Sequence, residues 1–379
     1  MVNPFVTKGY AGPDYFCDRE KETNDLIQLL SNENNMALIS PRRLGKTDLI
    51  HHCFAQPTIA RRYYTFIIDI YATSSLGDFV DVLGQAIFEE LKPFGRKVWK
   101  RFYSCLHSVQ QQISFDINGN PVWGIGLGAY TNPSTTLDEI FSYLSSAEKP
   151  CLVAIDEFQK IADYHDGENV EAALRTHVQR CANATFLFSG SKRHLMFEMF
   201  MSPSRPFYQS VITMGLKPIP EEKYAAFAER LFAQYGKSLD KDVVPEIYSR
   251  FDGVTFCLQR VMNVLFLTTE RCGQCNASMI DEAISYIIDL SSEHYEMLFS
   301  QMSEKQRGVF LAIASERRVR NIASGGFVRK HRQPSVSSVV SAVKGLLEKD
   351  FVTKENEEYY IYDHFFQLWL EKRKYVKSH

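Results

Sequence analysis

The sequence has neither a long hydrophobic run nor an excess of charge of one sign. Its 379 residues contain no run of about 18 apolar residues, and the N-terminus lacks an apolar signal segment. Lys and Arg number 43 and Asp and Glu number 45, so the formal net charge is −2 at pH 7. These features argue against membrane association and against a basic nucleic-acid-binding protein, unless a basic patch is local.

The sequence is also poor in cysteine patterns that could bind a metal. Cys272-Gly-Gln-Cys275 has no second pair and no His at ligand spacing, which favours a helix end with two incidental thiols over a zinc site. Most other cysteines lie in apolar runs, as expected for buried free thiols in a reducing cytoplasm. These runs contain Cys53, Cys151, Cys181 and Cys257. We therefore expect a cytoplasmic protein.

What the sequence does contain is a phosphate-binding pattern. The apolar run Met36 to Ile39 is followed by a loop, by Gly45-Lys46-Thr47 and by a helical pattern, which is the context of a P-loop. Backbone N–H groups and the helix N-terminus of such a loop face phosphates. Lys46 would reach the β- and γ-phosphates of ATP, and the Thr47 hydroxyl would ligate Mg²⁺.

One position departs from the pattern GxxxxGK[ST], because Ser40 stands where Gly is usual, and Ser accepts a tight turn less freely. The alternative is an ordinary strand–helix turn in which Gly-Lys-Thr supplies only a cap and a solvated charge. The candidate nucleotide-binding residues of the loop are Ser40, Pro41, Arg42, Arg43, Leu44, Gly45, Lys46, Thr47 and Asp48.

A second pattern supports the first. Cys151 to Gln159 reads CLVAIDEFQ, an apolar run followed by two acids, as in a Walker B strand. Asp156 would hold the Mg²⁺ shell beside Thr47, and Glu157 would polarise the attacking water. The alternative is a buried strand that ends in a solvated acidic turn. Because a P-loop precedes it, with a strand and helices between, nucleotide binding is favoured.

A further strand, Thr185 to Phe188, ends in Ser189-Gly190-Ser191. In P-loop ATPases of this layout, a polar residue there contacts the γ-phosphate or the attacking water, so both serines are candidates. A helix N-cap is the alternative. Beyond it lie basic residues at the place of a trans-acting arginine finger, for which a solvated basic turn is the alternative. These are Lys192, Arg193 and Arg205.

The remaining patterns up to residue 218 complete an α/β P-loop fold, a parallel sheet between helices. Tyr63 to Ile70 and Ser210 to Leu216 are predicted strands. Asn118-Gly119, flanked by alternating residues, predicts an inserted β-hairpin over 113–128. The glycines of 124–128 end this hairpin and open no helix, so we interpret them as a glycine-rich strand.

Two smaller domains are predicted after the P-loop domain of 1–218. Residues 219–294 are wholly helical in pattern, with helices at 221–236, 240–250, 254–271 and 276–290, and form an all-α lid. Residues 295–379 have the order helix, turn, helix and hairpin that is typical of a winged helix-turn-helix.

The winged-helix segment is locally basic. Between Ser303 and Thr353, Lys and Arg number 10 and Asp and Glu number 4. This charge fits contact with a DNA backbone, although winged helices also serve as protein–protein or intramolecular modules. The basic residues before the presumed recognition helix are Arg317, Arg318, Arg320, Arg329, Lys330 and Arg332.

Together these segments resemble the AAA+-type "archaeal ATPase" family, which also has bacterial members. The family is related to signal-transduction ATPases with numerous domains and, more distantly, to origin-recognition ATPases. SPRRLGKTDLI resembles its P-loop, LVAIDEFQKI its Walker B, and FLFSGSKRHLM with SRPFYQS its sensor-1 region. DGVTFCLQRV resembles its lid segment and YYIYDHFFQLWL the end of its winged helix. Phe16–Glu20 resembles its F-x-x-R-E box, which implies that Arg19 lies near the adenine.

The resemblance also shows a departure. Phe256 stands where origin-recognition relatives have a sensor-2 arginine, and Gly253-Val254-Thr255 lacks the usual proline. Arg260, one helical turn on, is a possible substitute. Weak sensing implies slow hydrolysis, as in a nucleotide-gated switch. Some family members carry a nuclease-like domain after the winged helix, and we expect no such activity in a chain that stops at His379.

These patterns lead to one main hypothesis and two others. The main hypothesis is an ATP·Mg²⁺-binding switch that hydrolyses ATP slowly to ADP and phosphate, with Glu157, Lys46, Ser189 and Arg193 as catalytic candidates. The second is a DNA-binding regulator or loader that contacts DNA through Arg329, Lys330 and Arg332. The third is a signalling scaffold that self-associates on ATP or binds a protein partner.

Overall fold

The structure is a computed structural model that describes residues 3–108, 114–115, 121–122, 132–373 and Tyr375. Contacts divide the chain into two compact units. The N-terminal unit comprises Val6–Tyr224 and Val254–Phe256. The C-terminal unit comprises Met1–Phe5, Ala225–Gly253 and Cys257–His379.

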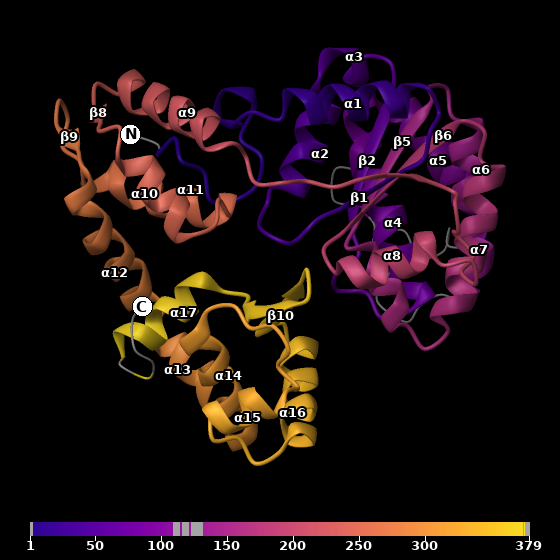
Figure 1. Ribbon diagram of the computed structural model, residues 1–379. Helices are drawn as coiled ribbons and strands as arrows, with labels where there is room; N and C mark the ends of the chain where they lie inside the picture. Colours follow the sequence, from indigo (N-terminus) through magenta and orange to yellow (C-terminus); the bar gives the residue numbers. More distant parts are fainter. Residues whose placement is uncertain (1–2, 109–113, 116–120, 123–131, 374, 376–379) are drawn as a thin grey trace. The chain divides into compact units, whose positions relative to one another are not determined.

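A parallel sheet forms the centre of the N-terminal unit (Figure 1). Among the described residues its order is β2-β5-β6-β1-β7, and every pairing is parallel. The strands are β1 (Met36–Ile39), β2 (Tyr64–Asp69), β5 (Cys151–Asp156), β6 (Ala184–Gly190) and β7 (Ile212–Met214). The predicted parallel sheet is confirmed, and β7 is its edge. Continuous apolar runs such as that of β5 arise because helices cover both faces of a parallel sheet.

Helices cover the two faces of this sheet with separate hydrophobic clusters. One cluster joins α1 (Glu20–Ser31), α2 (Lys46–Ala55) and α3 (Pro57–Ala60) to the sheet. The other joins the remaining helices of the unit. These are α4 (Leu76–Leu91), α5 (Arg96–Cys105), α6 (Pro133–Ser146), α7 (Gly167–Arg180) and α8 (Arg193–Met201). Side chains alternate along β1, with Ala37 and Ile39 in one cluster and Met36 and Leu38 in the other.

The predicted hairpin is present as a short antiparallel pair. β3 (Ser114–Phe115) pairs with β4 (Pro121–Val122). The predicted turn at Asn118-Gly119 and the glycines of 124–128 lie outside the described residues.

The lid segment contains the four predicted helices and one feature that was not predicted. The helices are α9 (Glu221–Gln234), α10 (Val243–Arg250), α11 (Thr255–Thr268) and α12 (Ile280–Leu290). Between them β8 (Ser238–Leu239) pairs in parallel with β9 (Gln274–Cys275), which corrects the all-α description. A ladder of two residues leaves no periodic signal in a sequence. Cys275 is buried and Cys272 is exposed, and among the described residues no three or more His, Cys, Asp or Glu side chains are grouped so that they could hold a metal ion.

The winged-helix segment has the predicted order of elements. It comprises α13 (Ser292–Ser300), α14 (Glu304–Glu316), α15 (Gly325–Lys330), α16 (Val336–Glu348), β10 (Val352–Glu355), β11 (Glu358–Ile361) and α17 (His364–Lys372). β10 and β11 form the antiparallel wing, and Val319 forms a bridge to Tyr359 on its outer side. The Ser303 side chain and Gln306 form a capping box that starts α14.

Polar contacts join the lid helices to the winged helix within the C-terminal unit. Lys372 Nζ, on α17, donates to Ser285 Oγ at 2.6 Å and lies 2.7 Å from Asp289 Oδ1, and both partners are on α12. Asp252, in the turn between α10 and α11, pairs with Arg318 at 2.6 Å. The finer division into a lid of 219–294 and a winged helix of 295–379 stays a prediction.

No helix in the described ranges combines the length and apolar character that crossing a bilayer requires.

Candidate functional site

The P-loop connects β1 to α2 and determines where the first candidate residues lie. Gly45 has φ 84°, a left-handed conformation that favours glycine, and it immediately precedes Lys46, the first residue of α2. Ser40 is not among the residues with positive φ, so this position does not require glycine and a serine fits. The departure from the GxxxxGK[ST] pattern therefore has no conformational cost at Ser40.

Lys46 is almost buried in this loop, with 5% of its surface exposed. Its ammonium group donates hydrogen bonds to the carbonyl oxygens of Ser40 at 2.8 Å and Pro41 at 3.0 Å. Burial lowers the pKa of Lys46 to about 8, and the nearby carboxylates of Glu157 and Asp156 oppose this shift. Among the described residues, the Lys46 ammonium group is thus a desolvated cation whose hydrogen-bond acceptors are neutral carbonyls, an arrangement that favours an anion.

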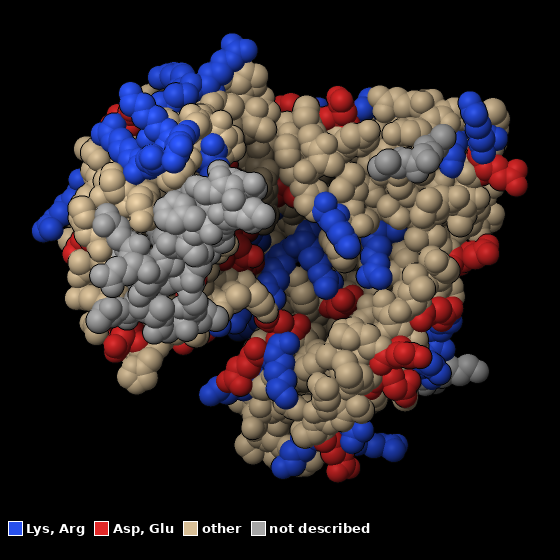
Figure 2. Space-filling view, turned by 180° about the vertical axis from the view of Figure 1, so that it is seen from behind, with Lys and Arg blue, Asp and Glu red and all other residues tan. Residues whose placement is uncertain are grey.

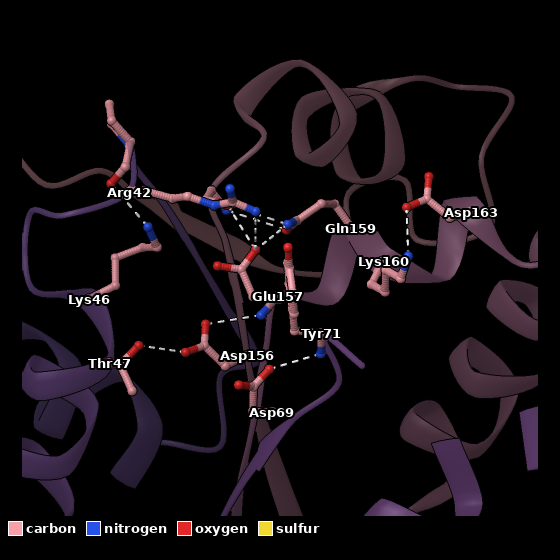
Figure 3. A network of polar contacts seen from close by, with 12 residues as sticks. Arg42, Lys46, Thr47, Asp69, Tyr71, Asp156, Glu157, Gln159, Lys160 and Asp163 are labelled. Atoms are coloured by element: carbon pink, nitrogen blue, oxygen red, sulfur yellow. Dashed lines mark hydrogen bonds and ion pairs between the residues drawn. The ribbon is translucent and has the colours of Figure 1, made fainter. Parts of the chain in front are cut away.

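Thr47 and Asp156 meet across the gap between α2 and β5. The Thr47 hydroxyl donates to Asp156 Oδ2 at 2.5 Å, and the backbone N–H of Glu157 donates to Asp156 Oδ1 at 3.0 Å (Figure 3). Asp156 is buried at the carboxyl end of β5. The two residues named from the sequence as metal ligands are therefore adjacent, with hard oxygen donors of the kind that Mg²⁺ prefers.

Asp69 is a third acid at this edge that the sequence analysis did not assign to the site. It ends β2, and the strand register pairs it with Asp156 (Figure 3). Burial raises the pKa of Asp69, and the charges of Asp156 and Glu157 raise it further. An acid that closes an apolar strand was the available signal, but only the strand order puts Asp69 beside Asp156.

Glu157 is held by donors from two other parts of the chain. Ser191 Oγ donates to Glu157 Oε2 at 2.8 Å, and Gln159 Nε2 also donates to it (Figure 3). The Arg42 guanidinium lies 4.0 Å from the same oxygen and donates to Ser191 Oγ at 3.1 Å. The residue itself has φ 57°, so the left-handed backbone turns the side chain away from the strand direction.

The two candidate serines after β6 have different surroundings. Ser191 belongs to the Glu157 network. Ser189 is fully buried, and its hydroxyl has no hydrogen-bond partner among the described residues. A buried hydroxyl without a partner costs free energy, so a ligand atom that reaches it would relieve that cost. The sequence alone could not distinguish these two positions.

Arg19, in the N-terminal segment, forms a hydrogen bond with the P-loop. It is 3% exposed, and its guanidinium donates to the carbonyl oxygens of Leu44 at 3.3 Å and Lys217 at 2.8 Å. It also pairs with Glu22 at 2.8 Å. Arg19 therefore joins the loop to the segment that leads into α9.

A second P-loop residue contacts the start of α11. The backbone N–H of Phe256 donates to the Arg43 carbonyl at 3.1 Å, and the Arg43 guanidinium lies 5.0 Å from the centre of the Phe256 ring. Arg260 instead donates to Ser291 Oγ at 3.3 Å and lies over the Phe365 ring, within the C-terminal unit.

The remaining candidates near the site have other surroundings. Arg205 pairs with the fully buried Glu171 and with two further glutamates, so it belongs to a closed ionic network of its own unit. Arg193 is half-buried and lies 5.9 Å from the Phe197 ring centre. Asp48 is in the first turn of α2, and burial raises its pKa.

Most of the basic residues of the winged helix are paired with acids. Arg317 pairs with Glu371, Arg318 with Asp252 and Glu358, Arg320 with Glu358, and Lys330 with Glu316. Arg329 and Arg332 are exposed, and neither has a carboxylate within 4.0 Å in the described part of the chain. The solvent side of α16 includes Val336 and Val340. The apolar side chains of Val336 and Val340 cannot form the bidentate hydrogen bonds by which proteins distinguish DNA bases.

Comparisons with known proteins agree with this description. Residues 293–372 match the family model described as "Probable winged helix domain". An uncharacterized ATP-binding protein of Methanocaldococcus jannaschii is 31% identical over 169 residues, which are 39% of this chain and 44% of that protein. The match therefore spans less than half of the relative.

Solved structures of similar fold cover nearly the whole chain. The Walker-type ATPase of Pyrococcus abyssi has a TM-score of 0.66 and 17% identity, over 97% of this chain and 99% of its own. The Aeropyrum pernix ORC2 protein has a TM-score of 0.58 and 13% identity, over 98% of this chain and 98% of its own. The ORC1 protein of the same organism, solved in complex with DNA, has a TM-score of 0.52 and 12% identity, over 96% of this chain and 94% of its own. The predicted fold, a P-loop ATPase domain followed by a winged helix, is confirmed.

Proposed function

We propose that the protein binds ATP with Mg²⁺ at the carboxyl edge of its parallel sheet and hydrolyses it slowly, as a nucleotide-gated switch. The observation that carries this proposal is the contact of Thr47 with Asp156 beside the buried ammonium group of Lys46. The ATP-binding relative and the Walker-type ATPase fold support the same conclusion.

The side chains present fit a nucleoside triphosphate and a magnesium ion. Thr47 and Asp156 would hold the ion, which when bound neutralises charge that develops on the phosphates. Lys46 would exchange the carbonyls of Ser40 and Pro41 for phosphate oxygens, and the N-terminus of α2 would face the same anion. The buried Ser189 hydroxyl has a free hydrogen-bonding capacity for the γ-phosphate. Arg42, Arg43, Leu44, Gly45 and Asp48 would shape the loop around the nucleotide.

Glu157 is the residue that would accept a proton from the attacking water. Its carboxylate already accepts hydrogen bonds from Ser191 and Gln159, and these bonds compete with a water molecule for the same oxygen. Turnover should therefore be slow. Arg193 is our candidate for an arginine that acts on a neighbouring subunit, whereas the ionic network of Arg205 favours a structural role for that residue.

The switch would act through the P-loop. Leu44 is bonded through Arg19 to the segment before α9, and Arg43 is bonded to Phe256 at the start of α11. A loop that rearranges when Lys46 and Ser189 gain or lose the γ-phosphate would change both contacts, and so bias the C-terminal unit. Arg43 and Phe256 would thereby replace a sensor-2 arginine.

The test is a titration of the purified protein with fluorescent ATP and ADP analogues and Mg²⁺, with phosphate release followed in parallel. We expect micromolar binding and slow release, and Lys46→Ala should abolish binding. Lys160→Ala is the matched control, because Lys160 also follows a strand of the central sheet, β5, but pairs with Asp163 on the surface. Binding without turnover would favour a scaffold, for which ATP-dependent sedimentation of the same samples is the check. Failure of the intact protein to bind either nucleotide would refute the proposal.

A DNA-binding regulator is the second candidate, favoured by the winged helix and by the exposed Arg329 and Arg332. Its DNA affinity should fall with salt and should weaken when Arg329, Lys330 and Arg332 are all changed to Gln. Unchanged duplex affinity in that triple variant would count against this candidate.

A further inference from the structure

A concentrated basic surface lies on the N-terminal unit at the amino ends of the strands, opposite the candidate nucleotide site. α5 has the sequence RKVWKRFYSC, which contains four basic residues and no acid. Figure 2 shows Lys and Arg side chains gathered at the upper left, over α5 and the end of α3, with few acids among them. We call this the α5 surface. Its members are Arg61, Arg62, Arg96, Lys97, Lys100 and Lys149.

Contacts between distant segments bring these residues together. Lys149, just before β5, donates from Nζ to the Arg61 carbonyl at 3.2 Å. The same ammonium group lies 5.5 Å from the ring centres of Tyr64 and Phe94, and these two rings pack edge to face at 4.9 Å. Phe94 directly precedes the turn into α5. The start of β2, the start of β5 and the start of α5 therefore form one surface.

Among the described residues, no acid pairs with the charges of the α5 surface. Two nearby acids are already paired with other residues, Glu89 with Lys92 at 2.6 Å and Glu148 with Arg101 at 3.5 Å. None of the six members has a carboxylate within 4.0 Å among the residues that the structure describes. In a protein with a net charge of −2, this local field would attract a polyanion.

The shape of α5 distinguishes between kinds of polyanion. Trp99 and Phe102, on its apolar face, are 8% and 0% exposed, so α5 cannot insert that face into a lipid bilayer. Arg96 and Lys100 lie one turn apart, about 6 Å along the helix, which is on the scale of two successive phosphates of one nucleic-acid strand. Arginine guanidinium groups also match phosphate oxygens in geometry.

We propose that the α5 surface binds the phosphate backbone of nucleic acid. This site is separate from the winged helix and from the candidate nucleotide site, and it does not depend on the function proposed above. Because its contacts are with phosphates, binding should be independent of sequence and should weaken steeply with salt.

The test uses the full-length protein and fluorescein-labelled oligonucleotides, duplex and single-stranded, with anisotropy measured between about 50 and 200 mM salt. Arg96→Gln/Lys97→Gln/Lys100→Gln should weaken binding about tenfold or more and should reduce the slope of log affinity against log salt by about 2 to 3. Arg61→Gln/Arg62→Gln, from another segment, should weaken binding in the same direction. Far-UV circular dichroism and the nucleotide titration should be unchanged in both variants.

The matched control removes the same charge from scattered positions. Lys21→Gln/Lys241→Gln/Arg271→Gln changes three exposed residues outside the α5 surface and should bind like the unmodified protein. The proposal is wrong if both α5-surface variants keep full affinity, or if the scattered control weakens binding equally. It is also wrong if phosphatidylserine vesicles bind the protein and oligonucleotides do not. A loss confined to the Arg329/Lys330/Arg332 variant would assign the interaction to the winged helix and would likewise overturn it.

Discussion

The candidate nucleotide site and the winged helix use charge in opposite ways. At the nucleotide site, Lys46 contacts neutral carbonyls, and Asp69 and Asp156 end neighbouring strands. In the winged helix, Arg317, Arg318 and Arg320 each have an acid as a partner. The first arrangement leaves charge for a ligand, and the second uses charge to hold helices, turn and wing together. A run of basic residues in a sequence therefore says little until its partners are known.

The largest expected effect concerns the ionic network of Arg205 in the N-terminal unit. Arg205→Ala should lower the free energy of unfolding by about 3–5 kcal/mol, because it leaves the fully buried Glu171 without its ionic partner. Urea denaturation measures the change. Arg193→Ala is the control, a half-buried arginine for which we expect well under 1 kcal/mol. Equal stability of both variants would mean that Arg205 is available for another role.

The second largest expected effect concerns Glu157 at the candidate nucleotide site. Glu157→Gln should keep nucleotide affinity and reduce turnover on the order of 100-fold or more, since the amide cannot accept a proton from water. Single-turnover phosphate release is the measurement. Asp163→Asn removes an exposed carboxylate nearby and should leave the rate unchanged. Robust turnover by Glu157→Gln would exclude the role proposed for Glu157.

A smaller effect is expected where the lid contacts the winged helix. His364, whose Nε2 lies 3.8 Å from Asp252 Oδ2, and then the hydrogen bond from Arg318 lower the pKa of Asp252 to about 2, from 3.8 in the unfolded chain. This stabilisation is complete above about pH 4 and is lost as the pH falls through about 2. Asp252 is half-exposed, so we expect Asp252→Asn to cost only about 1 kcal/mol near neutral pH.

The measurement for Asp252 is urea denaturation near pH 6 and near pH 3. The difference in stability between the unmodified protein and Asp252→Asn should shrink at the lower pH. A constant difference would show that the charge of Asp252 contributes nothing.

The smallest expected effect concerns the paired arginines of the winged helix. Arg317→Gln/Arg320→Gln should leave oligonucleotide affinity within about twofold, because both side chains are engaged with Glu371 and Glu358. Anisotropy at low salt is the measurement. A severalfold loss would mean that these ion pairs open for a ligand, and the contrast between the two regions would disappear.

Local patterns were sufficient to predict the elements of the site. The P-loop and the acidic strand end were predicted because each depends on a short run of residues, such as Gly45-Lys46-Thr47 or Asp156-Glu157. The same holds for the helices of the winged helix. The pairing of β8 with β9 was not predicted, since two-residue strands have no period to detect.

Contacts between residues that are distant in the sequence could not be predicted from these local patterns. Asp69 belongs to the edge only through its register with Asp156, and Glu157 is held by Ser191 and Arg42 from two other segments. The basic run of α5 is visible in the sequence, but its convergence with Arg61 and Lys149 is not. The conformation of the P-loop could not be predicted from the sequence either. Ser40 fits its position because the backbone there does not need a positive φ.

The sequence by itself determined most of the strands and helices along the chain, the P-loop pattern and the acidic strand end that accompanies it. Those features depend on hydrophobic period and on residues within one turn of each other. Only the tertiary structure decided which charges are neutralised and which are left for a ligand. Electrostatic interactions depend on distance and burial in space, so an arginine such as Arg317 pairs with an acid in the winged helix, whereas Arg96 on α5 has no carboxylate within 4.0 Å among the described residues.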